Sequence, residues 1–194
     1  MEVIDKNFWE KRWENNETGW DVGNITTPLK EYIDQIDDKN IKILLPGAGN
    51  GYEFEYLYNQ GFTNVYVVDI AHTPLENIKK RMPHIKEEFL LHADFFHIND
   101  TFDLIVEQTF FCAINPDLRK EYVGKAHQLL NAKGKIAGLL FDFPLTTEGP
   151  PFGGCKEEYV GLFSDKFTIK TLEKAHNSIK PRADKEFFII FEKK

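Results

Sequence analysis

A glycine-rich turn follows an apolar run and precedes an acid at the spacing of a nucleotide-type cofactor site. Gly47 and Gly49 come directly after residues 41–45, and Asp69 ends a second apolar run about one helix later. Glycine lets the backbone turn sharply and approach a ligand, because no Cβ stands in the way. A carboxylate placed like Asp69 can accept both ribose hydroxyls of an adenosine. The spacing therefore predicts a site for an adenosine cofactor.

The glycine turn leaves two such cofactors open, NAD and S-adenosylmethionine (SAM). An NAD turn uses a third glycine where its helix meets the pyrophosphate, and this chain has Tyr52 there. SAM carries no phosphate and does not need that cradle. Asp94 and Phe95 follow the third apolar run, where a SAM enzyme places a polar group near the adenine amine and an aromatic ring along its face. Taken alone, these residues could equally be a polar turn and a core phenylalanine.

The elements that would position these residues alternate between strand and helix. Strands are predicted over about 41–45, 65–69, 88–91, 103–106 and 135–141, as apolar runs bounded by turn residues. Helices are predicted over Asp5–Glu14, from Pro28 to about Ile36, and over Tyr52–Gln60, Pro74–Met82 and Pro116–Asn131. Near-continuous apolar strands that alternate with helices indicate a parallel sheet covered on both faces.

The end of the chain departs from this alternation. Lys166–Lys170 and Glu186–Phe191 are two extended segments joined by a loop that carries Pro181. Such a pair suits an antiparallel edge, which is the architecture of class I SAM methyltransferases. The predicted fold class is therefore α/β and Rossmann-like, with a mostly parallel seven-stranded sheet and an antiparallel C-terminal edge pair. We expect one domain over 1–194, with a helical region over 1–40 and the Rossmann-like core over 41–194.

Bulk properties exclude several classes of partner. The net charge is −7 and basic residues are scattered, whereas nucleic-acid binding depends on clusters of Lys and Arg. Cys112 and Cys155 are too few for a disulfide framework or a zinc site. The acidic start at residues 1–5 does not resemble a signal peptide, and no apolar run approaches membrane-spanning length. We expect a cytoplasmic monomer that holds no metal and binds neither nucleic acid nor membrane.

Several short motifs occur along the whole chain in a specific combination. The most informative are Phe8-Trp9-Glu10-Lys11-Arg12-Trp13, Trp20-Asp21-Val22-Gly23, Leu45-Pro46-Gly47-Ala48-Gly49, Val68-Asp69-Ile70, Asp94-Phe95-Phe96, Phe110-Phe111-Cys112-Ala113-Ile114, Pro116 with Arg119, and Gly149-Pro150-Pro151-Phe152. In this combination the chain resembles the thiopurine methyltransferase family, including its thiol and halide methyltransferase branch. The resemblance implies a class I fold and SAM as methyl donor, with S-adenosylhomocysteine as its product.

The same resemblance implies roles for the residues of a SAM site. Trp9, Trp13 and Trp20 would form an N-terminal lid, which fits the preference of a sulfonium cation for an indole face. In the alternative interpretation, Trp9 and Trp13 only anchor their helix to the core. The other implied cofactor contacts are Gly47 and Gly49 with the methionine portion, Asp69 with the ribose, Asp94 and Phe95 with the adenine, and Gln108 near the sulfonium.

Methyl transfer to a soft anion such as a thiolate needs alignment and a dry pocket rather than a general base. Accordingly, no residue is assigned a catalytic role from the sequence. Aromatic residues near the expected strand ends could form the pocket. The family resemblance implies that Arg182 attracts an anion there, and the alternative is that Arg182 is a solvated loop residue. The predicted substrate pocket consists of Phe110, Phe111, Phe141, Phe143, Phe152 and Arg182.

The resemblance implies a small, soft nucleophile as methyl acceptor, and we expect this acceptor to be a thiol sulfur. Halide, thiocyanate or chalcogen oxyanion methylation is one alternative, although Phe141 and Phe143 occupy the segment where the plant halide branch has a tyrosine. A SAM-binding module without catalysis is a second alternative. We do not expect a nucleic-acid base as the substrate. The Pro-Pro-Phe segment begins with Gly149, which offers no side-chain acceptor, and it follows the fifth strand rather than the fourth; the net charge is also acidic.

Overall fold

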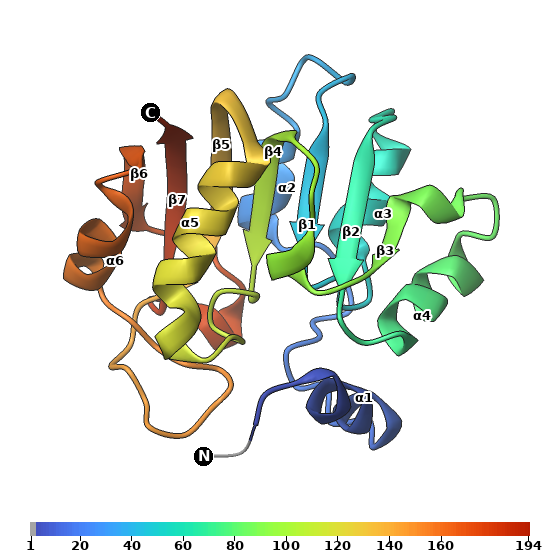
Figure 1. The fold of residues 1–194 in the computed structure, drawn as a ribbon, viewed down its shortest axis with the longest axis horizontal. Coiled ribbons are helices and arrows are strands. Elements are labelled where there is room, and N and C mark those ends of the chain that lie inside the picture. The colour runs from blue at the N-terminus through green and yellow to red at the C-terminus, as the bar shows by residue number, and fades with distance from the viewer. Residues whose placement is uncertain (1–2) are drawn as a thin grey trace. The chain divides into compact units, whose positions relative to one another are not determined.

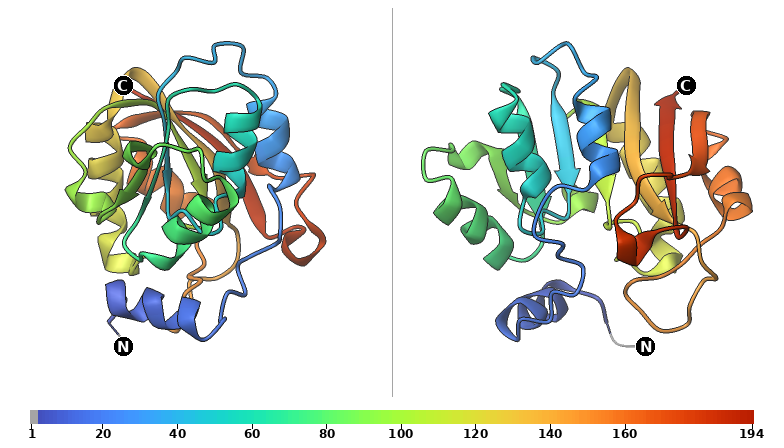
Figure 2. Two further views of the ribbon diagram at one scale, coloured as in Figure 1. Left: turned by 90° about the vertical axis from the view of Figure 1, so that its right-hand side faces the viewer. Right: turned by 180° about the vertical axis from the view of Figure 1, so that it is seen from behind.

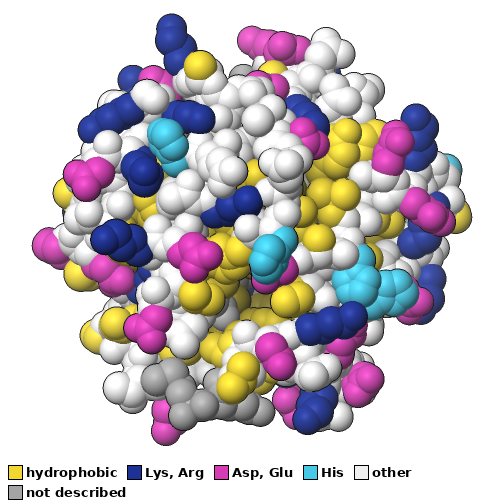
Figure 3. Space-filling model, viewed as in Figure 1, with side chains coloured by type: hydrophobic (Ala, Val, Ile, Leu, Met, Phe, Trp, Pro, Cys, Tyr) yellow, Lys and Arg dark blue, Asp and Glu magenta, His cyan; other side chains and the backbone are white. Residues whose placement is uncertain are grey.

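The computed structural model describes residues 3–194, so the first two residues of the acidic start lie outside the described part of the chain. Backbone contacts divide the chain after Ile98 into two units, and each is described separately (Figure 1). No helix within residues 3–194 is long and apolar enough to cross a membrane. On the face shown in Figure 3, acidic and basic side chains are interspersed rather than gathered by sign.

The first unit, up to Ile98, contains three parallel strands in the order β3-β2-β1. Its elements are α1 (Lys6–Glu14), α2 (Thr27–Ile33), β1 (Ile43–Pro46), α3 (Tyr52–Asn59), β2 (Val65–Asp69), α4 (Thr73–Arg81), η1 (Glu87–Phe89), β3 (Leu90–His92) and η2 (Phe95–His97). Helices α2 and α3 lie together behind β1 and β2 in Figure 1 and in front of them in the reverse view of Figure 2.

Helix α1 lies beyond the carboxyl ends of β1 and β2 (Figure 1). The helix begins where predicted, because the Asp5 side chain accepts the Phe8 N–H at 2.9 Å and so caps the first turn. Glu10 on the same helix accepts hydrogen bonds from the His72 N–H and, at 2.9 Å, from the Thr73 hydroxyl. These bonds fix α1 to the start of α4, next to the end of β2.

The second unit, from Asn99 onward, contains four strands in the order β4-β5-β7-β6. Its elements are β4 (Phe102–Gln108), η3 (Pro116–Leu118), α5 (Arg119–Leu129), β5 (Leu130–Phe141), α6 (Lys156–Phe163), β6 (Phe167–Lys174), η4 (Lys180–Arg182) and β7 (Glu186–Lys193). Strands β4 and β5 are parallel, whereas β7 is antiparallel to both β5 and β6. The predicted antiparallel C-terminal pair is confirmed, and the seven predicted strands are all present.

The largest differences from the sequence-based elements lie in the second unit. The helix predicted over Pro116–Asn131 starts as a short 3-10 helix and becomes α-helical only from Arg119 to Leu129. It ends early because Leu130 already pairs with Phe102 as the first residue of β5. Helix α6 was not predicted, since its first turn lacks a side-chain cap and its apolar periodicity is weak.

The start of α3 generates a first prediction. Gly51 is the N-cap residue with φ +68°, and a Cβ on it would stand 2.5 Å from Cδ1 of the buried Ile78 in α4. Gly51→Ala should therefore lower the free energy of unfolding through both backbone strain and overpacking, by about 2–4 kcal/mol. Urea denaturation measures the loss.

Gly61→Ala is the matched control for the steric part of that loss. Gly61 has φ +87°, but nothing lies within 4 Å of a Cβ built there. It should lose only the backbone part, about 1–2 kcal/mol. Equal losses in the two variants would contradict close α3–α4 packing as the reason for glycine at position 51.

Candidate functional site

The glycine turn after β1 leaves open space in front of its backbone. Gly47 and Gly49 adopt φ +69° and +51°, and the Gly47 N–H donates to the Val68 carbonyl of β2 at 2.8 Å. A Cβ built on Gly49 would meet nothing within 4 Å. Glycine is therefore needed at position 49 for its backbone conformation, and the turn presents a surface that a ligand can approach closely.

Asp69, the last residue of β2, faces the same turn. Its Oδ1 accepts the Ala71 N–H at 2.8 Å, and its carboxylate also accepts the N–H groups of Gly49 and Ala48. Burial raises the pKa of Asp69 to about 6, these three N–H groups oppose the rise, and the negative charge of Glu10 adds to it. The carboxylate is thus held in a fixed orientation beside the turn.

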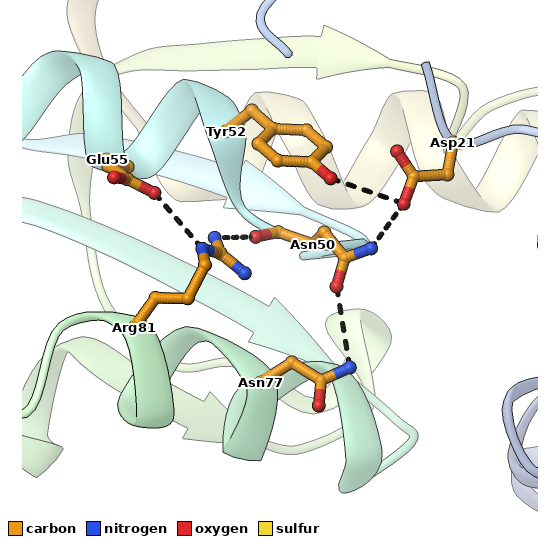
Figure 4. Close-up of polar contacts among 6 residues, drawn as sticks. All are labelled: Asp21, Asn50, Tyr52, Glu55, Asn77 and Arg81. Atoms are coloured by element: carbon orange, nitrogen blue, oxygen red, sulfur yellow. Dashed lines mark hydrogen bonds and ion pairs between the residues drawn. The ribbon is translucent and has the colours of Figure 1, made fainter. Parts of the chain in front are cut away.

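Asn50 connects the glycine turn to the loop that follows α1 (Figure 4). Its amide nitrogen donates to Oδ2 of Asp21, which also accepts the Tyr52 hydroxyl at 3.4 Å. The Asn50 amide oxygen accepts from Asn77 of α4 at 3.4 Å. One amide side chain therefore bridges the loop over 15–27, the glycine turn and α4.

Arg81 of α4 holds the same turn through its backbone. Its guanidinium donates to the Asn50 carbonyl and lies 3.2 Å from Oε2 of Glu55 in α3 (Figure 4). Sequence reasoning assigned no role to Asn50 or Arg81. The Asn50 side chain lies inside the glycine motif and could have been singled out, whereas Arg81 at the end of a helix carries no distinctive signal in the sequence.

The structure brings the three tryptophans together. The Trp20 ring meets the Trp9 and Trp13 rings edge-to-face, with centroids 5.6 and 5.7 Å apart. Trp13 is buried, as is Phe8 on the same helix, while Trp9 and Trp20 are half-buried. Trp13 is therefore the ring that anchors α1, and the other two keep exposed surface.

The residues expected near the adenine lie at the start of η2. Asp94 caps this helix by accepting the Phe96 N–H at 3.0 Å, and its other oxygen lies 3.3 Å from Nδ1 of His97. Phe95 is buried and packs edge-to-face on Phe96, 5.5 Å between ring centroids. Of the two rings, Phe96 keeps the larger exposed surface.

In the second unit, a buried carboxylate holds the turn at the end of β4. Oε1 of Glu107 accepts the N–H groups of Phe110 and Phe111, both at 2.9 Å, and Oε2 accepts the Tyr122 hydroxyl at 2.7 Å. Burial raises the pKa of Glu107 to about 7, and the same three donors oppose the rise. Thr109 lies inside this turn at φ +60°, which is rare for a β-branched residue.

Glu107 was not identified from the sequence, although an acid within the apolar run of β4 was a usable signal. Gln108, the next residue, ends β4 and is half-buried. The carboxylate thus fixes the segment that carries Gln108 and Thr109 at the strand end, where α/β proteins bind ligands.

Arg119 connects two of the sequence motifs through its buried guanidinium. It donates to the carbonyls of Gly153 at 2.8 Å and Phe152 at 3.5 Å, and it pairs with Glu158 of α6 at 2.7 Å. Its Cζ also lies 4.8 Å from the centroid of the Phe111 ring. Arg119 is only 2% exposed, and it holds the Pro-Pro-Phe segment against the turn after β4.

A cavity opens beside this turn and contains about 230 Å3 of empty space, its open mouth included. Phe111 and Phe141 belong to its wall, as predicted for pocket residues. The other predicted rings, Phe110, Phe143 and Phe152, are not among the lining residues. The wall consists of Thr109, Phe111, Cys112, Leu139, Leu140, Phe141 and Glu186.

The remaining predicted pocket residue, Arg182, is buried next to this wall. Its Nη1 lies 3.7 Å from Oε1 of Glu186, and its Cζ lies 5.9 Å from the centroid of the Phe141 ring. Burial raises the pKa of Glu186, while Ser178 and Arg182 oppose the rise. Glu186 was not identified from the sequence, because an acid at the start of a predicted strand carries no distinctive signal.

Comparisons with known proteins identify the fold and the family. The chain is similar to probable thiol methyltransferase 2 of Arabidopsis thaliana, with 32% identity over 78% of this chain and 69% of that protein. It is 29% identical to thiocyanate methyltransferase 1 of Brassica oleracea, over 95% of this chain and 84% of that protein.

Among solved structures, 1,6-didemethyltoxoflavin-N1-methyltransferase of Burkholderia thailandensis, with bound S-adenosylhomocysteine, superposes with a TM-score of 0.79. The two sequences are 16% identical, and the match covers 97% of this chain and 86% of that one. The predicted class I SAM methyltransferase fold is confirmed. The family model for thiopurine S-methyltransferase matches residues 4–193. The chain belongs to the thiopurine S-methyltransferase family and is a SAM-dependent methyltransferase.

Proposed function

We propose that this enzyme transfers the methyl group of SAM to the sulfur of a small thiol. The cavity at the end of β4 carries the proposal. Its room for the centre of a water-sized sphere is only about 10 Å3, so the cavity suits a small methyl acceptor. Most of its wall is apolar, and an apolar wall strips water from a soft nucleophile and raises its reactivity.

The geometry of the first unit fits SAM. Gly49 leaves room for a ligand against the backbone, and the fixed carboxylate of Asp69 can accept ribose hydroxyls. When bound, SAM supplies a methyl group that its sulfonium activates toward nucleophiles. The residues that we propose to hold it are Gly47, Gly49, Asp69, Asp94 and Phe95, with Gln108 at the end of β4 and with Trp9, Trp13 and Trp20 as a lid.

In the second unit we propose different tasks for the predicted pocket residues. Phe111 and Phe141 form the wall of the substrate cavity, and Arg182 sets the charge behind that wall. Phe152 is held in place by Arg119 and supports the wall from outside. Phe143 flanks the wall, since its ring centroid lies 5.1 Å from that of Phe141. Phe110 directly precedes the wall residue Phe111 in the turn after β4.

Thiocyanate is the second candidate acceptor, and a similar protein bearing that name supports it. We further propose that the enzyme works as a cytoplasmic monomer whose two units act as one domain. The net charge of −7 supports the absence of a nucleic-acid partner.

The proposed activity predicts the outcome of a substrate screen. The protein is incubated with SAM and, in turn, with 2-mercaptoethanol, sulfide, 6-mercaptopurine, iodide, thiocyanate, selenite and tellurite. S-adenosylhomocysteine is then measured by chromatography. We expect turnover with at least one small thiol or sulfide, and a lower kcat/KM for the bulkier mercaptopurine. Product formation with iodide or thiocyanate alone would show that the thiol assignment is wrong.

Asp69 predicts a pH dependence of ligand affinity. The ionised carboxylate accepts the ribose hydroxyls, so protonation below about pH 6 should weaken S-adenosylhomocysteine binding. Between pH 7.5 and pH 5 the Kd should rise about tenfold, as one protonation predicts. Titration calorimetry measures it, and Asp69→Asn should bind weakly with a nearly flat profile. Asp37→Asn, at an exposed position, should keep the wild-type profile.

The stability of the ligand-free protein should follow the opposite sign. The pKa of Asp69 is raised on folding, so its contribution to stability is complete below the unfolded value of 3.8 and is lost as the pH rises through about 6. Asp69→Asn should remove this loss. A stability that increases with pH over this range only when Asp69 is present would contradict its burial.

The loop over 15–27 provides a test of the lid. Asp21→Ala removes the contact with Asn50 and should raise the Kd for S-adenosylhomocysteine about 5–30-fold, a loss of about 1–2 kcal/mol. The melting temperature of the ligand-free protein should change little. Trp13→Ala should instead lower the free energy of unfolding by about 3–5 kcal/mol, since that ring is buried. Unchanged affinity in Asp21→Ala would leave the loop without a role in binding.

A further inference from the structure

One ionisable carboxyl group, that of Glu186, belongs to the wall of the substrate cavity. Glu186 begins β7 and pairs with Phe141 at the end of β5. It is 2% exposed, so contact with solvent does not explain a carboxyl group at this position. Burying an acid is unfavourable unless partners compensate for the lost hydration, and the choice of an acid here needs a reason.

The partner of Glu186 determines what charge the cavity can accept. Arg182 lies four residues before Glu186, with its Nη1 3.7 Å from the carboxylate, so the positive charge of Arg182 is paired with the carboxylate of the wall. A site built for a bare anion would direct the guanidinium charge at the anion without a competing carboxylate. An anion entering this cavity meets a carboxylate in its wall, whereas a neutral thiol meets a proton acceptor.

We propose that Glu186 is the general base that accepts the proton of a neutral thiol during methyl transfer, an inference that rests on the proposed function. The S–H bond breaks and its proton goes to a Glu186 oxygen. The sulfur electron pair forms the new bond to the methyl carbon. The bond from that carbon to the sulfonium breaks, and its electron pair stays on the sulfur of S-adenosylhomocysteine. The proton leaves Glu186 to solvent before the next cycle.

The surrounding groups fit this role. Burial raises the pKa of Glu186, which makes the carboxylate a better proton acceptor. Hydrogen bonds from Ser178 and Arg182 and the charge of Arg182 oppose this rise in pKa. Burial raises the pKa of the Cys112 thiol far above its usual range, so this second polar group of the wall stays protonated and is no competing base. The ion pair of Lys174 with Asp142 is the other nearby charge pair, on the neighbouring strand β6 and just after β5.

Two mechanisms predict different pH profiles for the wild-type enzyme at saturating SAM. With Glu186 as base, kcat/KM for 2-mercaptoethanol should reach a plateau well below the pKa of that thiol. If the enzyme instead binds preformed thiolate, kcat/KM rises tenfold per pH unit up to the thiol pKa. Repeating the profile with methyl thioglycolate, a more acidic thiol, should leave the bend at the same pH. A bend that moves with the thiol pKa would overturn the proposal, and this measurement needs no variant.

Glu186→Gln tests the residue directly. It should lower kcat/KM for 2-mercaptoethanol at pH 7 by about 100-fold or more, and the loss should shrink as the pH approaches the thiol pKa, because solution then supplies thiolate. Affinity for S-adenosylhomocysteine should not change. Glu192→Gln is the matched control, on the same strand but paired with Lys135 and Lys170 at the surface.

A uniform loss at every pH in Glu186→Gln would show that the residue only positions Arg182 and would overturn the proposal. If the wild-type enzyme methylates no thiol, the proposed function fails and this inference fails with it. If the wild-type enzyme methylates thiols but its kcat/KM rises tenfold per pH unit up to the thiol pKa, the proposed function stands and only this inference fails.

Discussion

A carboxylate buried at the end of a strand must find hydrogen-bond donors, and both units of this protein find them in the backbone of the following or facing turn. Asp69 takes three backbone N–H groups, two of them from the glycine turn. Glu107 takes two from the turn after β4 and a tyrosine hydroxyl from α5. An unsatisfied buried charge would cost several kcal/mol, so each turn is fixed by the acid that it must satisfy. These hydrogen bonds hold both turns to the strand ends.

In the second unit a buried positive charge, that of Arg119, likewise holds a loop through hydrogen bonds to its backbone. The Arg119 guanidinium is buried against the Phe111 ring and the Glu158 carboxylate. It also donates to two carbonyls of the segment after β5 and so holds that segment in place. Pro116 with Arg119 and the Gly-Pro-Pro-Phe segment stand far apart in the sequence and looked like independent motifs. In the structure one guanidinium joins them. Their joint occurrence has a physical reason, since the loop has no strand ladder to satisfy its carbonyls.

Most of the fold could be predicted from the sequence, because the capping and turn residues agree with the alternation of strands and helices. Asp5 caps the helix that it was expected to cap, and the glycine turn follows β1 as predicted. The site was predicted less completely. Spacing along the chain identifies residues that lie on turns after strands, such as Gly49 and Asp69. It does not reveal which distant side chains converge.

Glu186 and Arg119 illustrate the second kind of residue. Arg119 sits in the first turn of an ordinary amphipathic helix, and its burial depends on a loop that starts about thirty residues later, too far for any local periodicity to show. Glu186 can be recognised as a site residue only in the structure, where it lines a cavity together with residues of β5 and of the turn after β4. Phe152 is expected in the pocket as one of the rings near the strand ends, and the structure adds a long-range contact, because its backbone N–H donates to the Cys112 carbonyl at 2.8 Å.

Helix α1 has a consequence for anyone who shortens or re-engineers the chain. Glu10 is the acceptor for the first donors of α4, and the Trp13 ring fills space in the same unit. Deleting this helix would strip two donors of their acceptor and expose apolar surface beside the end of β2. The deletion should therefore lower the free energy of unfolding as a core mutation does, unlike the removal of a terminus that makes no contacts. A minimal version of this enzyme has to begin before Asp5.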